Sequence, residues 1–136
     1  MTGPPRETSE RFIVLFAQYG SAVARAADRI APSAELAGNG SLTVLCVLDL
    51  DGPSRPGHLQ RLTGLSSGGV SKMLDRLSEA KLVRRSYGVV PGDNRGVLVT
   101  ITPQGRRLVR AIASELGKHL PETTSLPKEV LTLAPP

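Results

Sequence analysis

The chain has 136 residues, of which 17 are Lys or Arg and 12 are Asp or Glu, which gives a net charge of +5. This length suffices for one small domain with helical extensions, and because Trp is absent and other aromatic residues are few, the core must be aliphatic. The sequence has no apolar run as long as a membrane span and begins without a signal-peptide pattern, so we expect a cytoplasmic protein without a membrane partner.

The first expected element is an amphipathic helix over residues 12–30. Its apolar residues recur every three or four positions and share one face, and Pro32 ends it. They are Phe12, Phe16, Tyr19, Val23, Ala26 and Ile30. Such a stripe is typical of a helix that packs on the core of its own chain or of a seam for a partner helix, and the pattern leaves both interpretations open.

A second apolar segment, residues 42–50, follows an AGNGS breaker and contains the only cysteine, Cys46. A lone cysteine cannot form an internal disulfide or a multi-cysteine metal site. Free cysteine is among the most buried residue types. Cys46 is therefore either a small core residue or a redox-sensing thiol.

A short helix is expected to follow the DGPSR turn. Ser54 is its predicted N-cap, and Pro56 lies in its first turn, where the missing N–H of proline costs nothing. Leu59 and Leu62 face inward, and Gly64 ends the helix.

The stretch GLSSGGVSKMLDRL, residues 64–77, has two interpretations. Gly64 and Gly69 have the spacing of a phosphate-binding loop, but Val70 stands where such a loop needs Lys. The favoured interpretation is a second helix with Ser66 as its N-cap. Its inward-facing residues are Val70, Met73, Leu74 and Leu77. Two short helices joined by a tight glycine-containing turn predict a helix-turn-helix.

The outward face of this second helix predicts contact with DNA. Small and basic residues, among them Ser71 and Lys72, occupy its first half and let the backbone approach a groove closely. Asp75 and Glu79 follow on the same face, where their charge would repel phosphates. We therefore expect only the N-terminal half to enter the major groove.

The rest of the chain predicts a hairpin and a final helix. LVRRSY and GVLVTI are rich in β-branched residues and flank a turn-rich loop, which indicates a hairpin with a basic tip. Thr102 and Pro103 are expected as N-cap and first residue of a helix that Pro121 ends. Its apolar positions are Leu108, Ile112, Leu116 and Leu120. Residues 125–130 are expected to form one further turn.

In this order, the helix-turn-helix, the hairpin and the TPQG helix start resemble the MarR family of bacterial winged-helix regulators. GLSSGGVSKMLDRLSEAKLVRR, Asp93-Asn94-Arg95 and ITPQGRRLV carry the likeness, which covers residues 41–120. The resemblance implies a mainly α fold with a small β-hairpin wing: a winged helix-turn-helix with N- and C-terminal dimerisation helices. We expect DNA binding from residues 41–101 and dimerisation from residues 1–40 and 102–136.

The resemblance also implies roles for single residues. Arg95 enters the minor groove and Asp93 orients it, unless the two form a local ion pair that closes the wing. The recognition-helix contacts fall on Ser67, Gly68, Ser71, Lys72 and Arg76, and the basic segment adds Arg55. The expected dimerisation residues are Phe12, Phe16, Tyr19, Val23, Leu108, Ile112 and Leu116.

Some positions depart from the family pattern. Lys81 stands where a glycine usually ends the recognition helix, at a cost of about 1 kcal/mol if that residue is left-handed. Gln60 replaces a small residue at the crossing of the two short helices. Pro121 and Pro127 interrupt the region of the usual long final helix, so the dimer either relies on the first helix and the helix after Thr102 or is weak.

The distribution of charge agrees with DNA binding. Residues 55–110 contain eleven basic and three acidic residues, which gives this segment +8 and leaves −3 for the rest of the chain. A basic centre is typical of a nucleic-acid-binding module, and a merely solvated basic face is the alternative.

We expect a sequence-specific transcriptional regulator of double-stranded DNA, a repressor that acts as a homodimer and is released by a small-molecule effector. The alternative is a winged-helix protein-interaction or adapter module that binds an acidic partner without reading DNA sequence. An enzyme is not expected, because His58 and His119 lie far apart and no metal-ligand cluster occurs in the sequence. No cofactor is expected either.

Overall fold

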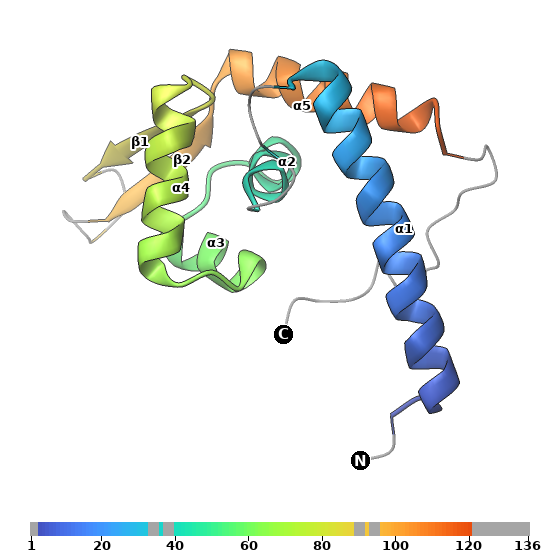
Figure 1. Ribbon diagram of the computed structural model, residues 1–136. Coiled ribbons are helices and arrows are strands. Elements are labelled where there is room, and N and C mark those ends of the chain that lie inside the picture. The colour runs from blue at the N-terminus through green and yellow to red at the C-terminus, as the bar shows by residue number, and fades with distance from the viewer. Residues whose placement is uncertain (1–2, 33–35, 37–39, 89–91, 93–95, 121–136) are drawn as a thin grey trace.

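The computed structural model describes residues 3–32, 36, 40–88, 92 and 96–120 (Figure 1). Five helices and one hairpin follow each other within these ranges. They are α1 (Arg6–Ile30), α2 (Ser41–Asp51), α3 (Pro56–Thr63), α4 (Ser67–Glu79), β1 (Val83–Tyr87), β2 (Val97–Ile101) and α5 (Pro103–Gly117). The predicted fold class, mainly α with a small hairpin, is confirmed. The turn expected at residues 125–130 lies outside the described residues.

Helix α2 lies in the middle of the molecule, between α4 with the hairpin on one side and α1 on the other (Figure 1). Its apolar residues are distributed around the helix, so it is covered on several sides, by α3, α5 and β2. Leu45 and Leu48 are fully buried at its centre. The aliphatic core predicted from the composition is therefore assembled around α2.

Within the described residues, helix α1 packs against the rest of the chain only near its C-terminal end. It packs against α5, and its two fully buried residues are Ala26 and Ala27. The N-terminal part of the helix extends away from the body of the molecule (Figure 1). Residues 6–21 are exposed along their whole length.

Helix α3 begins one residue later than predicted, and its N-cap is Arg55. The prediction that Ser54 is the N-cap was wrong, because the backbone of Ser54 pairs with β2 instead. The Ser54 N–H donates to the carbonyl of Val99 at 3.0 Å, and the Val99 N–H donates back at 2.8 Å. Gly64 ends the helix as predicted, with a left-handed φ of 70°. Leu59 is fully buried and Leu62 is half-buried.

The hairpin is antiparallel, with a register that runs from Val83 opposite Ile101 to Tyr87 opposite Val97. Thr102 closes its base and starts α5. The Thr102 hydroxyl donates to the carbonyl of Lys81 at 2.6 Å and accepts the Gly105 N–H at 3.0 Å. The predicted N-cap at Thr102 is therefore confirmed.

The start of α5 approaches the chain before β1 so closely that it requires glycine. A Cβ on Gly105 would lie 2.2 Å from the carbonyl oxygen of Leu82. Lys81, the residue before Leu82, has a left-handed φ of 61°. A lysine under backbone strain therefore occupies the position where the family usually has glycine. Helix α5 ends at Gly117, and a turn follows it to Leu120.

Candidate nucleic-acid interface

Helix α4 turns one face to the core and leaves the other open. The Gly69 N–H donates to the Ser66 hydroxyl at 3.1 Å, which confirms Ser66 as the N-cap. The inward residues Val70, Met73, Leu74 and Leu77 are all buried. The predicted contact residues Ser67, Gly68, Ser71, Lys72 and Arg76 are all exposed. The orientation of this helix is therefore as the sequence predicts.

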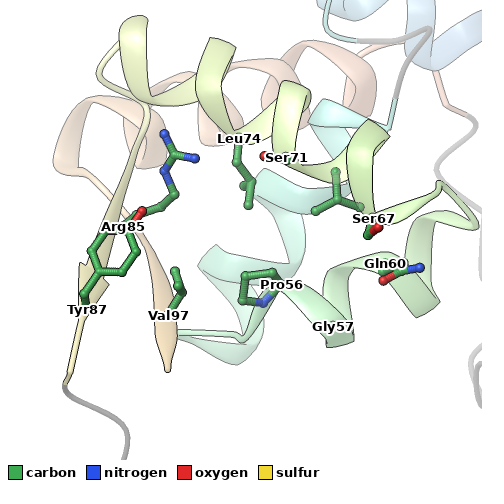
Figure 2. A pocket seen from close by; sticks show the side chains of 10 residues that line it. Pro56, Gly57, Gln60, Ser67, Ser71, Leu74, Arg85, Tyr87 and Val97 are labelled. Carbon is green, nitrogen blue, oxygen red and sulfur yellow. The ribbon is translucent and has the colours of Figure 1, made fainter. Parts of the chain in front are cut away.

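Helix α4, helix α3 and the hairpin surround a hollow of about 200 Å³ (Figure 2). Gln60 and Ser67 lie at one side of it, and Arg85 and Tyr87 of β1 lie at the other (Figure 2). Its other lining residues are Pro56, Gly57, Val70, Ser71, Leu74 and Val97. The first half of α4 and the outer end of the hairpin thus belong to one continuous surface.

A basic hollow of about 370 Å³ adjoins this surface at the outer end of the hairpin. Arg55, His58 and Arg61 line it from α3 and its N-cap, together with Gly96 and Val97. Of these three side chains, only Arg55 was predicted from the sequence to contact DNA. His58 and Arg61 were missed as site residues, although they follow Arg55 by three and six positions, a spacing that places all three on one side of a helix.

An ion pair joins the recognition-helix candidate to the hairpin. The Arg85 guanidinium Nη2 on β1 lies 2.8 Å from the Asp75 carboxylate Oδ1 on α4. The Arg85 side chain is 25% exposed and that of Asp75 is 54% exposed, so water reaches the pair. Asp75 was expected to repel phosphates, and Arg85 partly offsets its charge.

Cys46 is half-buried on α2. Burial, and to a smaller extent the negative charge of Asp49, raise the pKa of its thiol. Because the thiolate is the reactive form, a raised pKa favours the interpretation as a small core residue over that as a redox sensor. Among the described residues, no group of three or more His, Cys, Asp or Glu side chains is placed to hold a metal ion.

Comparisons with known proteins connect this geometry to a family. No family model matches the chain. Over 77 residues, 57% of the chain, the sequence is 32% identical to the multiple antibiotic resistance protein MarR of Salmonella typhimurium. This stretch is 52% of that protein, so the chain spans about half the length of the curated relatives it matches.

Solved structures extend the likeness beyond that stretch. The multiple antibiotic resistance repressor MarR superimposes with a TM-score of 0.65 at 24% identity, over 87% of this chain and 79% of that chain. BpsR of Bordetella bronchiseptica gives a TM-score of 0.59 at 26% identity, over 95% and 91%. The chain has the MarR-family fold. The resemblance inferred from residues 41–120 is thereby confirmed, and the proteins of similar fold include the transcriptional regulator Tm0710 of Thermotoga maritima and a MarR family transcription regulator.

In the MarR fold, α3 and α4 form the helix-turn-helix and β1 with β2 forms the wing. Two predicted wing residues, Asp93 and Arg95, lie outside the described residues. Their assignment to the minor groove stays a prediction. The described end of the wing is held by the Gly88 N–H, which donates to the carbonyl of Gly96 at 3.1 Å.

The residues expected at a MarR-type dimer interface fall into two groups. Phe12, Phe16 and Tyr19 on α1 are 52%, 70% and 44% exposed, and the first two rings stack with centroids 6.3 Å apart. The others are Val23, Leu108, Leu116 and Ile112, and they pack on the core of their own chain. Ile112 is only 3% exposed, so α5 uses this position for its own core and leaves little of it for a partner.

No helix in the described part of the chain is both long and apolar enough to span a lipid bilayer.

Proposed function

We propose that the chain is a sequence-specific transcriptional regulator that binds double-stranded DNA. The observation that carries this proposal is the shared exposed surface of α4 and the wing. Ser71 and Lys72 lie on it, next to the basic hollow at Arg55. Arg and Lys contacts to phosphates would supply salt-dependent affinity, while α4 reads base edges in the major groove.

The proposed regulator acts in the cytoplasm as a homodimer. Residues 1–40 and 102–136 would provide the dimer contacts, and residues 41–101 the DNA contacts. The exposed aromatic residues of α1 support this division, because contiguous apolar surface of that kind marks an interaction site. A two-fold dimer would place its operator half-sites about 10 bp apart, one turn of DNA.

Two finer assignments follow the family pattern. We assign Arg95 to the minor groove, with Asp93 orienting its guanidinium. We also propose that the regulator is a repressor released by a small molecule, as 6-hydroxynicotinic acid regulates DNA binding of BpsR. A ligand can release DNA only if it prefers one arrangement of the two recognition helices.

An electrophoretic mobility shift with the protein's own upstream DNA tests the proposal. Specific binding should survive an excess of nonspecific competitor DNA. Lys72→Ala should weaken specific binding by about 1–3 kcal/mol if Lys72 contacts a base. Lys118→Ala, which removes the same charge beyond α5, should leave it unchanged. Loss of all binding with competitor would instead favour an adapter that binds acidic partners.

A further inference from the structure

A third hollow, of about 460 Å³, lies at the base of the hairpin, where the ends of three elements meet. Its walls are the C-terminal end of α4 with the turn that follows, the start of β1 and the first turns of α5. Each of these parts contributes one cation. They are Lys81 after α4, Arg84 of β1 and Arg107 of α5. We call this place the distal hollow.

The distal hollow is separate from the surface assigned to DNA. Figure 1 shows α3 and α5 at opposite ends of α4. Ser67 belongs to the DNA-facing end of α4, and Ser78 belongs to the wall of the distal hollow. The two lie roughly 16 Å apart along the helix, at a rise of about 1.5 Å per residue. The cations of the distal hollow are therefore a part of the basic charge that the proposed DNA contacts do not use.

The three cations differ from a basic neighbour that is engaged within the fold. Arg106, which precedes Arg107 on α5, lies 3.0 Å from the carboxylate of Asp49. In the described part of the chain, no ion pair is seen for Lys81, Arg84 or Arg107. Cations that share one hollow repel one another, so an anion that contacts all three would be attracted by each and would relieve this repulsion.

The backbone of Lys81 distinguishes the distal hollow from an ordinary solvated basic surface. Its φ of 61° lies in the left-handed region, which suits glycine and is unfavourable for a residue with a Cβ. The Lys81 carbonyl accepts the Thr102 hydroxyl at 2.6 Å, which holds the backbone in this conformation. Strained backbone of this kind is concentrated at ligand-binding and other functional sites. The ammonium group of Lys81 is what the chain has here and would lack with glycine.

We infer that the distal hollow binds a phosphate monoester group. Such a group carries a charge of about −1.5 to −2 at pH 7 and has three strong acceptor oxygens. The planar guanidinium groups of Arg84 and Arg107 can each present two N–H groups to one phosphate. Lys81 adds a third positive charge, and the Ser78 hydroxyl at the wall is a further donor.

A DNA duplex fits the distal hollow less well than a single phosphate group. Binding to the DNA backbone draws its affinity from many contacts, for example about 6–10 phosphates spread along the duplex. The distal hollow offers three cations around one concave place. The start of α5 adds little to them, because the Gly105 N–H already donates to the Thr102 hydroxyl at 3.0 Å. The group could be carried by a small metabolite or by a phosphorylated side chain of another protein.

Titrations of the ¹⁵N-labelled full chain without DNA, followed by NMR at pH 7.5, test the inference. The probe is glycerol 3-phosphate, and its control is dimethyl phosphate, a diester with a single charge like the groups of the DNA backbone. We expect glycerol 3-phosphate to shift the amide signals of Lys81, Arg84 and Arg107 in a saturable way. It should bind at least about fivefold more tightly than the diester, because each cation attracts the additional charge. Equal binding of the two probes, or no saturable shift at these residues, would overturn the inference.

Matched variants place the binding in the distal hollow. Lys81→Gly should weaken the binding of glycerol 3-phosphate at least about threefold, because it removes one of three attracting charges. Glycine also suits a φ of 61°, so this loss would not come from unfolding. Arg107→Gln should weaken binding as well, whereas Arg25→Gln removes an exposed cation of α1 and should leave it unchanged. Unchanged affinity in Lys81→Gly or in Arg107→Gln would show that the probe binds elsewhere, which contradicts the inference.

Further titrations separate the sources of the group. A short peptide with one phosphoserine among alanines that binds more tightly than glycerol 3-phosphate would assign the site to a protein partner, and equal or weaker binding would assign it to a metabolite. Binding of the unphosphorylated peptide would refute the inference. A random duplex that shifts the same amides and binds more weakly to Lys81→Gly would assign the distal hollow to DNA and refute it too. Failure to bind an operator would refute only the proposed function.

Discussion

Lys81 shows what a single backbone angle costs in this fold. Among the described residues other than glycine, it alone has a positive φ, at 61°. Its position is fixed from two directions, since its carbonyl accepts the Thr102 hydroxyl and the Leu82 N–H next to it donates to the carbonyl of Leu77. The left-handed conformation costs a residue with a Cβ roughly 1–2 kcal/mol of conformational free energy.

Lys81→Gly should therefore raise the free energy of unfolding by about 0.5–1 kcal/mol, the relief of left-handed strain less the entropy that glycine loses on folding. Urea denaturation measures the change. Ala80→Gly is the control, because Ala80 has an ordinary right-handed φ of −76° and glycine there should only destabilise. A decrease in stability in both variants would contradict the role given to the angle.

At the scale of elements, the Asp75–Arg85 ion pair connects the recognition helix to the wing. The pair is partly exposed, so its contribution to stability is at most about 1 kcal/mol. Its geometric effect is more specific. We expect it to favour one angle between α4, the helix expected in the major groove, and the hairpin expected in the minor groove.

We expect Asp75→Asn to lower the ratio of specific to nonspecific DNA affinity by up to about fivefold, which is about 1 kcal/mol. Glu79→Gln removes the same charge from the same exposed face, and no ion pair is seen for Glu79 in the described part of the chain. This control should strengthen specific and nonspecific DNA binding to the same extent, so the ratio of the two affinities should stay unchanged.

A double-mutant cycle with Arg85→Gln completes the test, measured by fluorescence anisotropy on operator and random DNA. The double variant, Asp75→Asn with Arg85→Gln, should lower the ratio of specific to nonspecific affinity no more than either single change, because each change removes the same interaction. Additive losses would show that the two residues act independently of each other.

Local chemistry explains which elements could be predicted from the sequence. Ser66 and Thr102 cap helices within three residues of themselves, so their roles are visible in the sequence alone. Ser54 has the same local signature, but its backbone pairs with Val99, 45 positions further on, and that contact decides where α3 begins. The Asp75–Arg85 pair was likewise missed because it depends on how the wing folds back onto α4.

The candidate site could be predicted in its orientation but not in its extent. The periodicity of α4 indicates which residues face outward, and all of the predicted contact residues on that helix are exposed. The stripe of α1 behaves differently. Ala26 is buried by α5 while Phe12 and Phe16 on the same face are exposed, because periodicity identifies a face but not how much of it the chain covers.

At the scale of the whole molecule, the exposed half of α1 is the feature that a single chain leaves incomplete. Phe12, Phe16 and Tyr19 continue the face that packs on α5, yet no described part of the chain covers them. A second copy would supply the same surface in return, as two-fold dimers do.

Phe16→Glu should therefore shift the protein from dimer to monomer at micromolar concentration, because it places a charge within the proposed interface. Sedimentation velocity or light scattering measures the change. Gln18→Glu adds the same charge on the opposite side of α1 and should stay dimeric. A wild-type monomer at that concentration would remove the basis for the palindromic operator but not for the fold.

The projecting half of α1 also bears on how the amount of protein translates into gene control. If only paired chains hold two recognition helices in register, the working species forms in proportion to the square of the free chain concentration when the protein is scarce. A twofold drop in expression then removes about three quarters of the active regulator. Such a regulator responds to its own dosage more steeply than in proportion, and the dissociation constant of the dimer sets the concentration below which this holds.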